Sequence, residues 1–370
     1  MKILVTGAKG FIGQNLISEL RNKGFNEIYE YDLDTDQHLL DEYTSDCNFV
    51  FHLAGVNRPT NDEDFMKGNY HFTNQILEML SKHGNKAPFL LSSSIQASLA
   101  NSYGESKKKS EDLVFTYGKI NHIKVFVYRL PNVFGKWCRP NYNSAIATFC
   151  HNTAHHIPVK VNDPQVMMNL VYIDDVVASF INKIGSGGNL AYGEFEPIQP
   201  IYSIPLGSIY ELIISFRNCR ENLLIPDLGD DFIKKLYSTY LSYLPEGAFS
   251  YPLKMNIDHR GSFTEFFKTS DRGQISINII KPGIVKGNHW HHTKTEKFLV
   301  VSGSGVIRFR KVGQNKVIEY FVTEEKLEVL EIPPGYVHNI ENLGGKEMVT
   351  VIWANELLDK DNPDTYYLNV

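Results

Sequence analysis

Two hydrophobic periods alternate along the first 130 residues of the chain. Short, continuously apolar runs predict strands that are buried on both faces. These runs are 3–5, 49–51, 89–91 and 125–127. Between them, apolar residues recur every three to four positions, as in 16–20 and 76–80, which is typical of amphipathic helices. Strands that alternate with helices predict an α/β domain with a doubly wound parallel sheet.

From about residue 250 the pattern changes to short segments rich in Val, Ile and Phe, separated by Gly, Pro or Asn. Few stretches with helical spacing remain there, so an antiparallel β barrel or sandwich is expected. The predicted strands are 275–280, 297–301, 305–310, 317–322 and 348–353. We place the domain boundary near Pro245, which predicts an α/β domain at 1–245 and an all-β domain at 246–370.

Composition and charge narrow the class of protein. The 370 residues are 42% hydrophobic and 21% charged, which excludes disordered and fibrous chains. The formal net charge is −5 and no basic block occurs, so we expect no nucleic-acid partner. No run of about 18 apolar residues and no signal-peptide layout occur, so we expect no membrane partner. Cys47, Cys138, Cys150 and Cys219 form no CxxC pair, which favours reduced thiols in a cytoplasmic protein.

Three glycines follow the first predicted strand directly and open the helix that begins near Phe11. Glycines at this spacing let backbone N–H groups approach a pyrophosphate at the positive end of the helix, although they could also serve strand–helix packing alone. The position at the first strand favours a Rossmann-like dinucleotide site. The residues predicted to bind the cofactor here are Gly7, Lys9, Gly10, Phe11, Ile12 and Gly13.

Asp32 stands at the end of the second predicted strand. A carboxylate there would hydrogen-bond the adenosine ribose and repel a 2′-phosphate, which favours NAD over NADP. No Arg follows in 33–36, but Lys9 of the glycine loop could still hold a phosphate. Asp32 is thus a predicted cofactor-binding residue, and the sequence leaves the choice between NADPH and NADH open.

Tyr103 and Lys107 are four residues apart, so on a helix both side chains share one face. An ammonium beside a phenol, helped by an oxidised nicotinamide, would lower the pKa of the phenol. The pair could then move a proton at a carbonyl or alcohol oxygen. Ser94 closes a run of three serines at the end of the fourth predicted strand and would donate a second hydrogen bond to that oxygen.

Residues 1 to about 240 resemble the extended short-chain dehydrogenases/reductases that modify nucleotide sugars. The matching segments are 52–55, Asn69, 129–135 and 172–176. The resemblance implies that Ser94, Tyr103 and Lys107 carry catalysis. It also implies further cofactor contacts and substrate contacts. The cofactor contacts are Leu53, Ala54, Gly55 and Lys107, and the substrate contacts are Asn132, Lys136, Arg139 and Asn143.

The spacing of nine residues between Ser94 and Tyr103 is shorter than is usual in that class. It leaves open whether Ser93 or Ser94 is the hydrogen-bond donor.

The second domain contains a group of metal-ligating residue types. His289 and His291 would lie on the same face of one strand, Glu296 follows on the next, and His338 comes after a Pro-Pro-Gly turn. Imidazoles and a carboxylate that converge inside a small barrel form a divalent-metal site. We therefore predict that these four residues bind Zn²⁺.

This arrangement resembles the cupin family, whose first motif is matched in full, whereas Leu327 stands where the second motif would open with Gly. His292 adjoins the motif and is interpreted as exposed or as a support for the metal ligands. The segment 258–265 also resembles one that cupin-class sugar-nucleotide epimerases use near substrate. Arg260 is therefore a candidate for a substrate phosphate, with a surface salt bridge as the alternative.

The fusion of these two domains resembles the bifunctional capsular-polysaccharide enzymes of the UDP-N-acetyl-L-fucosamine pathway, over essentially the whole chain. The resemblance implies that the cupin domain epimerises C3 of a UDP-2-acetamido-2,6-dideoxy-4-hexulose. The reductase domain would then reduce the C4 ketone to UDP-2-acetamido-2,6-dideoxy-L-talose. It also implies zinc and NADPH, while Asp32 keeps NADH open, and we expect a homodimer.

The chemistry supports this interpretation, because the C4 ketone acidifies the C3 proton and is also the group that a hydride donor reduces. Tyr336 and His259 are candidates for the base at C3. One alternative is a nucleotide-sugar reductase or epimerase whose cupin holds a structural, dimerising metal. Another is a redox-sensing protein that binds nicotinamide nucleotide without turnover, against which the presence of Ser94, Tyr103 and Lys107 argues.

Overall fold

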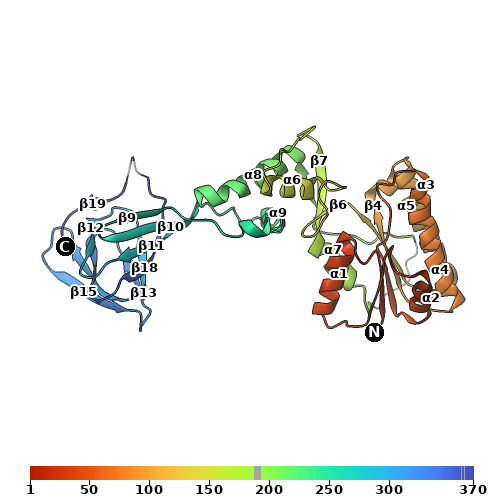
Figure 1. Ribbon diagram of the computed structural model, residues 1–370, viewed down its shortest axis with the longest axis horizontal. Coiled ribbons are helices and arrows are strands. Elements are labelled where there is room, and N and C mark those ends of the chain that lie inside the picture. The colour runs from red at the N-terminus through yellow and green to blue at the C-terminus, as the bar shows by residue number, and fades with distance from the viewer. Residues whose placement is uncertain (187–192, 360, 362) are drawn as a thin grey trace. The chain divides into compact units, whose positions relative to one another are not determined.

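The computed structural model describes residues 1–186, 193–359, 361 and 363–370 (Figure 1). Its contacts divide the chain into two compact units. Unit 1 comprises Met1–Ile214 and Lys235–Pro245, and unit 2 comprises Ser215–Lys234 and Glu246–Val370. Residues 215–234 group with the second unit because backbone hydrogen bonds join Leu223 and Ile225 to Lys268.

Unit 1 is built on a five-stranded parallel sheet, as the alternating pattern predicts. Its strands are β1 (Ile3–Thr6), β2 (Ile28–Tyr31), β3 (Phe49–His52), β4 (Phe89–Ser94) and β5 (Val125–Leu130). Their order in the sheet is β2-β1-β3-β4-β5. The chain adds β2 on one side of β1 and then β3, β4 and β5 on the other, so the strand order reverses between β1 and β3. In such folds, ligands bind at the carboxyl ends of the strands at this point.

Helices cover both faces of this sheet (Figure 1). The major helices are α1 (Phe11–Asn22), α2 (Gln37–Asp46), α4 (Phe72–Lys82), α5 (Ser102–Asn121) and α7 (Ile173–Ile181). One apolar core packs α1 and α7 against the sheet, and a second core packs α2, α4 and α5 against its other face. Both predicted helical stretches, 16–20 and 76–80, supply fully buried side chains to these cores.

Smaller elements complete the chain up to Ala248, and those within 215–234 and 246–248 belong to unit 2. Helical ones are α3 (Glu63–Phe65), a π-helical turn at Met66–His71, 3₁₀ turns at Ile95–Ser98 and Glu246–Ala248, α6 (Ala145–Ala154), α8 (Leu206–Asn222) and α9 (Asp231–Leu241). A three-stranded sheet contains β6 (Asn132–Phe134), β7 (Met167–Tyr172) and β8 (Tyr202–Pro205).

The remainder of unit 2 is formed by two antiparallel sheets. One has the order β16-β13-β18-β11-β10-β9 and the other the order β15-β14-β17-β12-β19. The strands are β9 (Met255–Asp258), β10 (Gly261–Thr269), β11 (Gly273–Ile280), β12 (Val285–Trp290), β13 (Glu296–Ser302), β14 (Ser304–Lys311), β15 (Val317–Thr323), β16 (Val329–Ile332), β17 (Tyr336–Asn342), β18 (Met348–Ala354) and β19 (Tyr366–Tyr367).

The five strands predicted for this region correspond to β11, β13, β14, β15 and β18, so the all-β expectation is confirmed. Side chains of both sheets, among them Phe298, Ile307 and Ile340, form its apolar core. In the described ranges no helix is long and apolar enough to cross a bilayer. The four cysteines are unpaired, as the sequence predicts.

Candidate functional site

The glycine loop between β1 and α1 has a backbone that only glycine allows. Gly7 has φ +69°, and a Cβ atom added to it would lie 2.7 Å from the backbone nitrogen of Ala54. A Cβ on Gly13 would lie 2.2 Å from the carbonyl oxygen of Gly7. The loop therefore packs directly on the segment after β3, which contains the predicted cofactor residues Leu53 and Gly55.

The first turn of α1 fits the phosphate groups of a dinucleotide. Gly10 is the residue before the helix and supplies no capping side chain. The first N–H groups of a helix have no partner within it, so those of Phe11, Ile12 and Gly13 point outward at the positive end of the helix dipole. Backbone amides and a short, glycine-lined approach are what pyrophosphate binding requires.

Asp32 contacts the glycine loop itself. The backbone N–H of Lys9 donates to the Asp32 carboxylate at 2.7 Å, and the N–H of Leu33 donates at 2.8 Å. The ammonium of Lys9 pairs with Asp34. Asp32 thus fixes the loop in addition to any contact with a ribose, a role that sequence reasoning missed.

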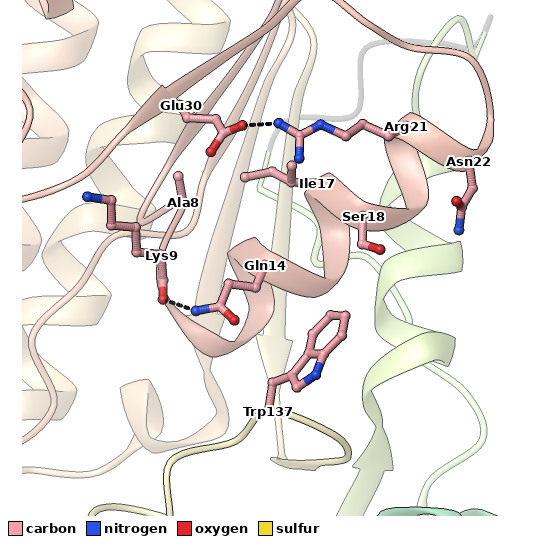
Figure 2. A pocket seen from close by; sticks show the side chains of 9 residues that line it. All are labelled: Ala8, Lys9, Gln14, Ile17, Ser18, Arg21, Asn22, Glu30 and Trp137. Carbon is pink, nitrogen blue, oxygen red and sulfur yellow. Dashed lines mark hydrogen bonds and ion pairs between the residues drawn. The ribbon is translucent and has the colours of Figure 1, made fainter. Parts of the chain in front are cut away.

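A pocket of about 420 Å³ opens beside this loop, along the exposed face of α1 (Figure 2). Its lining includes Lys9, Gln14, Arg21 and Glu30 on one side and the indole of Trp137 on the other. Arg21 donates to Glu30 at 2.5 Å, and Gln14 donates to the carbonyl oxygen of Lys9 at 2.6 Å. None of the serine, tyrosine and lysine side chains predicted for catalysis lines it, so the pocket is adjacent to the loop rather than the centre of the chemistry.

Tyr103 and Ser94 meet where α5 packs on the 3₁₀ turn after β4. A Cβ on Gly104 would lie 2.4 Å from the carbonyl oxygen of Gln96, so the glycine allows this close approach. Burial raises the pKa of the Tyr103 phenol, and the nearby Ser94 hydroxyl only partly offsets the rise. The Ser94 hydroxyl oxygen also accepts from the backbone N–H of Gln96 at 3.2 Å.

Lys107 lies one turn further along α5 and is buried. Its ammonium donates to the carbonyl oxygen of Ser92 at 3.3 Å. Burial lowers the pKa of Lys107 to about 8, although the negative charge of Glu111 opposes this. Lys107 is not among the groups that shift the pKa of Tyr103, and the predicted lowering by the ammonium together with an oxidised nicotinamide stays a prediction.

Two residues of the resemblance segments shape the space around Lys107. A Cβ on Gly55 would lie 2.9 Å from the Lys107 ammonium nitrogen and 2.8 Å from Asn69 Oδ1. Asn69 lies in the π-helical turn and donates to the hydroxyl of Ser106 at 2.9 Å. Its amide oxygen accepts from the backbone N–H of Val56 at 2.9 Å. The π turn thus ties the loop after β3 to the helix that carries Tyr103 and Lys107.

Ser93 faces a different partner from Ser94. Its hydroxyl donates to the carboxylate of Glu111, which is 1% exposed and forms an ion pair of 2.6 Å with Arg129. Sequence reasoning missed Glu111. Glu111 comes four residues after Lys107 and eight after Tyr103, so the three side chains share one helix face. This spacing could have identified Glu111 from the sequence.

The predicted substrate residues of unit 1 lie on exposed or half-buried loops and strands. Lys136 pairs with Asp174 at 2.5 Å, and the Arg139 guanidinium lies 5.2 Å from the centre of the Tyr142 ring. Asn132 donates to the carbonyl oxygen of Asn169 at 3.3 Å, and Asn143 is exposed. These contacts do not bring the four together, and their role toward substrate stays a prediction.

In unit 2, the four predicted metal ligands converge. His289 and His338 face each other across β12 and β17, Glu296 opens β13, and His291 is the first residue after β12. A β-bulge and the positive φ of Asn288 precede His289. β12 ends at Trp290, so His291 lies just after the strand and not on it as predicted, yet the ring centres of His289 and His291 are only 4.9 Å apart.

The donor atoms of this group fit a metal ion. One donor atom from each of the four residues lies within 4.8 Å of all the others. Glu296 Oε2 lies 3.5 Å from the Nε2 atoms of both His291 and His338. A tetrahedron with bonds of about 2.0–2.1 Å has edges of roughly 3.3–3.4 Å.

Three of these atoms have no other partner. His291 Nε2, His338 Nε2 and Glu296 Oε2 are buried and accept or donate no hydrogen bond within the part of the chain that is described. Buried polar atoms without partners are rare and destabilising, so a cation that binds all three would remove the penalty.

The electrostatics of the centre favour the metal-binding forms of its side chains. Burial lowers the pKa of His289 to about 4, which keeps its imidazole neutral. Burial alone would raise the pKa of Glu296, but the imidazoles of His291 and His338 beside its carboxylate outweigh burial and lower the pKa to about 2. A neutral imidazole and an ionised carboxylate are the forms that bind divalent cations.

Residues flanking the centre are placed as follows. Arg260 forms an ion pair with Asp258 at 2.7 Å, and His259 is exposed. The half-buried ring of Tyr336 packs against the apolar core of the barrel. His292 is exposed, and its ring lies 4.5 Å from that of Trp290.

Comparisons with known proteins match both units. The NAD dependent epimerase/dehydratase family matches residues 3–184, and the polysaccharide biosynthesis C-terminal domain matches residues 256–366. A UDP-2-acetamido-2,6-beta-L-arabino-hexul-4-ose reductase from Pseudomonas aeruginosa is 44% identical over 370 residues, covering 100% of this chain and 99% of that protein.

Solved structures are also similar to this chain. The capsular polysaccharide assembling protein CapF from Staphylococcus aureus is 50% identical, with a TM-score of 0.94 and 100% coverage of both chains. A UDP-glucose 4-epimerase from Thermotoga maritima is 19% identical, with a TM-score of 0.55, over 66% of this chain and 98% of the other. The last likeness supports the fold only.

Proposed function

The chain belongs to the CapF-type family of capsular polysaccharide assembling proteins. From this premise, we propose that it is a bifunctional nucleotide-sugar enzyme. The metal centre of unit 2 epimerises C3 of a UDP-2-acetamido-2,6-dideoxy-4-hexulose. The Tyr103 centre of unit 1 then reduces the C4 ketone with NADPH or NADH. The product is UDP-2-acetamido-2,6-dideoxy-L-talose, a precursor for capsule or O-antigen synthesis.

The observation that carries the reductase proposal is that Tyr103 and the buried Lys107 lie one turn apart on α5, with Ser94 near enough to the phenol to affect its pKa. Two hydroxyl groups that meet at one point can both hydrogen-bond a single carbonyl oxygen. The name of the Pseudomonas relative, which matches along the whole chain, describes the same ketone reduction.

In the reduction, Tyr103 gives its phenolic proton to the C4 oxygen while Ser94 holds that oxygen by a hydrogen bond. The raised pKa of Tyr103 keeps the phenol protonated at neutral pH, as a proton donor requires. A reduced nicotinamide, when bound at the glycine loop, supplies the hydride that forms the new C4–H bond. The charge of Lys107 stabilises the phenolate that remains on Tyr103.

In the epimerisation, His289, His291, Glu296 and His338 hold the cation. A divalent cation, when bound there, acts as a Lewis acid toward the ketone and makes the C3 proton more acidic. His289 is the half-buried imidazole of the four, whereas His291 and His338 are buried. We assign the accessible side of the centre to His289, the side from which a substrate oxygen could approach.

The cofactor proposal remains NADPH or NADH. Asp32 would accept hydrogen bonds from the ribose hydroxyls of NADH, and Lys9 could pair with a 2′-phosphate after releasing Asp34. Asp32→Ala is expected to weaken the binding of both nucleotides, because the glycine loop loses a contact that holds it. The binding of NADH is expected to be weakened more than that of NADPH. If wild type and variant each use NADH and NADPH equally well, Asp32 does not contact the ribose.

The deciding experiment incubates the full chain, loaded with Zn²⁺, with the UDP-4-hexulose named for the relative and each nicotinamide in turn. NMR of the products is expected to show a reduced C4 and an inverted C3. Retention of the C3 configuration would favour the alternative of a reductase with a structural metal. Nucleotide binding without any sugar product would favour a redox sensor and overturn the proposal.

A further inference from the structure

The end of the chain, residues 363–370, lies against the strand that carries the metal ligands. Tyr366 and Tyr367 form β19, which pairs with β12 so that Tyr367 is opposite His289. The backbone N–H of Leu368 donates to the carbonyl oxygen of Asn288 at 3.0 Å. We call residues 363–370 the C-terminal segment.

Asp364 of this segment holds the turn that follows His291. Its carboxylate accepts from three successive backbone N–H groups, those of His292 at 2.8 Å, Thr293 at 2.7 Å and Lys294 at 2.8 Å. The Thr293 hydroxyl donates to the same carboxylate at 3.2 Å. One anion that collects successive amides fixes the backbone between two metal ligands, His291 and Glu296.

The backbone of Asp364 also orients a ligand directly. Its carbonyl oxygen contacts Nδ1 of His291. A carbonyl oxygen can only accept, so the His291 proton must lie on Nδ1 and the lone pair on Nε2. Nε2 is the atom that lies 3.5 Å from Glu296 Oε2 and has no hydrogen-bond partner among the described residues.

The other buried imidazole is held less closely. Nδ1 of His338 lies 3.5 Å from the carbonyl oxygen of Tyr336, at the limit of a hydrogen bond. Side-chain contacts reinforce the C-terminal segment next to His291, since the Tyr366 ring lies 4.8 Å from that of His292 and 5.0 Å from that of Trp290. The support is thus concentrated on the loop that carries His291.

We propose that the Asp364 carboxylate is a positioning group of the metal centre: by fixing the backbone of 292–294 it holds the Asp364 carbonyl oxygen against Nδ1 of His291, which sets the tautomer and ring orientation of that ligand. The inference rests on the proposed metal centre and adds a requirement for the end of the chain. Groups that orient metal-bound imidazoles typically contribute about 10- to 100-fold in metal affinity. Asp364→Ala keeps the backbone carbonyl group but removes the four carboxylate bonds that hold it beside His291.

The experiment measures Zn²⁺ binding to the metal-stripped full chain by competition with a chromogenic chelator. Asp364→Ala is expected to raise the Kd about 10- to 100-fold, and Asp364→Asn, which retains one acceptor oxygen, by less. The matched control is Asp271→Ala, because Asp271 is an exposed carboxylate of the same unit that pairs only with its neighbour Arg272 in the described contacts. The control is expected to bind Zn²⁺ as wild type does.

Two further readouts separate positioning from a general loss of stability. Amide hydrogen exchange in the metal-free chain is expected to accelerate at 292–294 by at least about tenfold in Asp364→Ala, and not in the β11–β18 pairing. The Co²⁺ absorption spectrum is expected to change for Asp364→Ala and to stay unchanged for Asp271→Ala. If Asp364→Ala fails to fold, Asp364→Asn carries the same comparison.

Wild-type affinity and an unchanged Co²⁺ spectrum in folded Asp364→Ala would overturn the positioning role while leaving the metal centre in place. Absence of saturable Zn²⁺ binding by the wild-type chain would remove the metal centre, and the inference with it. The two failures are therefore distinct. C3 exchange in the 4-keto sugar, measured separately, tests the epimerase proposal and does not enter this comparison.

Discussion

The two candidate centres differ in how their polar groups are satisfied. Around Tyr103, the Lys107 ammonium, the Ser93 hydroxyl and the Asn69 amide all have protein partners. At the metal centre, buried donor atoms of His291, Glu296 and His338 have none in the described residues. The first centre is complete as a protein structure, whereas the second requires a cation to satisfy its buried atoms.

This difference indicates how each centre depends on its ligand. Removal of nucleotide should leave unit 1 folded, because its network is closed within the protein. Removal of metal should destabilise unit 2, because ligand binding to the native state stabilises it by mass action and the buried atoms lose their partner. The following variants test whether the two centres are as separate as their geometry implies.

The largest effect is expected for Tyr103→Phe, which removes only the proton donor. Reduction of the C4 ketone should fall about 10²- to 10⁴-fold while nucleotide still binds. Deuterium exchange at C3 in D₂O, measured by NMR without nicotinamide, should continue at the wild-type rate. Near-normal oxidation of NAD(P)H by this variant would end the assignment of Tyr103.

The reciprocal variant is His338→Ala, which removes one buried ligand. C3 exchange should fall at least about 10²-fold, because the remaining ligands hold the Lewis acid weakly. Unit 1 should still bind nucleotide, as measured by fluorescence titration. Exchange that persists at the wild-type rate in a folded protein, shown to be metal-free by elemental analysis, would leave the metal a structural role only.

A smaller effect should separate the two serines that the sequence leaves open. Ser94→Ala should lower kcat/KM for reduction by about 10- to 100-fold, because the Ser94 hydroxyl lies near enough to the Tyr103 phenol to affect its pKa and could hydrogen-bond the same substrate oxygen. Ser93→Ala should change the rate by less than about tenfold and lower stability by about 1 kcal/mol, since Ser93 donates to Glu111. The reverse ranking in steady-state kinetics would exchange their roles.

The smallest effect concerns pH. The pKa of Lys107 is lowered to about 8, so its charged form is lost as the pH rises through that value. If the ammonium stabilises the phenolate, kcat/KM for reduction should fall up to about tenfold per pH unit above pH 8. Lys107→Arg should remove the decline, because a guanidinium stays charged. A wild-type profile that is flat to pH 10 would exclude titration of Lys107 as the cause.

Most of the fold could be predicted, and both sets of candidate side chains could be selected, because the signals that indicate them are local. The buried runs that became β1, β3, β4 and β5 are continuous in sequence, and the parallel sheet follows from their alternation with helices. Tyr103 and Lys107 share a helix face through their spacing. The four candidate metal ligands are recognisable because His and Glu are residue types that bind divalent metals and they occur close together in the sequence.

What the sequence by itself determined is therefore which residues could do chemistry and on which element each lies. Only the tertiary structure decided their partners: the Glu111 carboxylate accepts from Ser93, whereas the Ser94 hydroxyl oxygen accepts from the backbone of Gln96. In the same way, Asp32 braces the glycine loop and Asp364 reaches the turn after His291. Periodicity reports which face of a helix or strand is buried, but a contact between distant segments depends on how whole elements pack, and no local pattern records that packing.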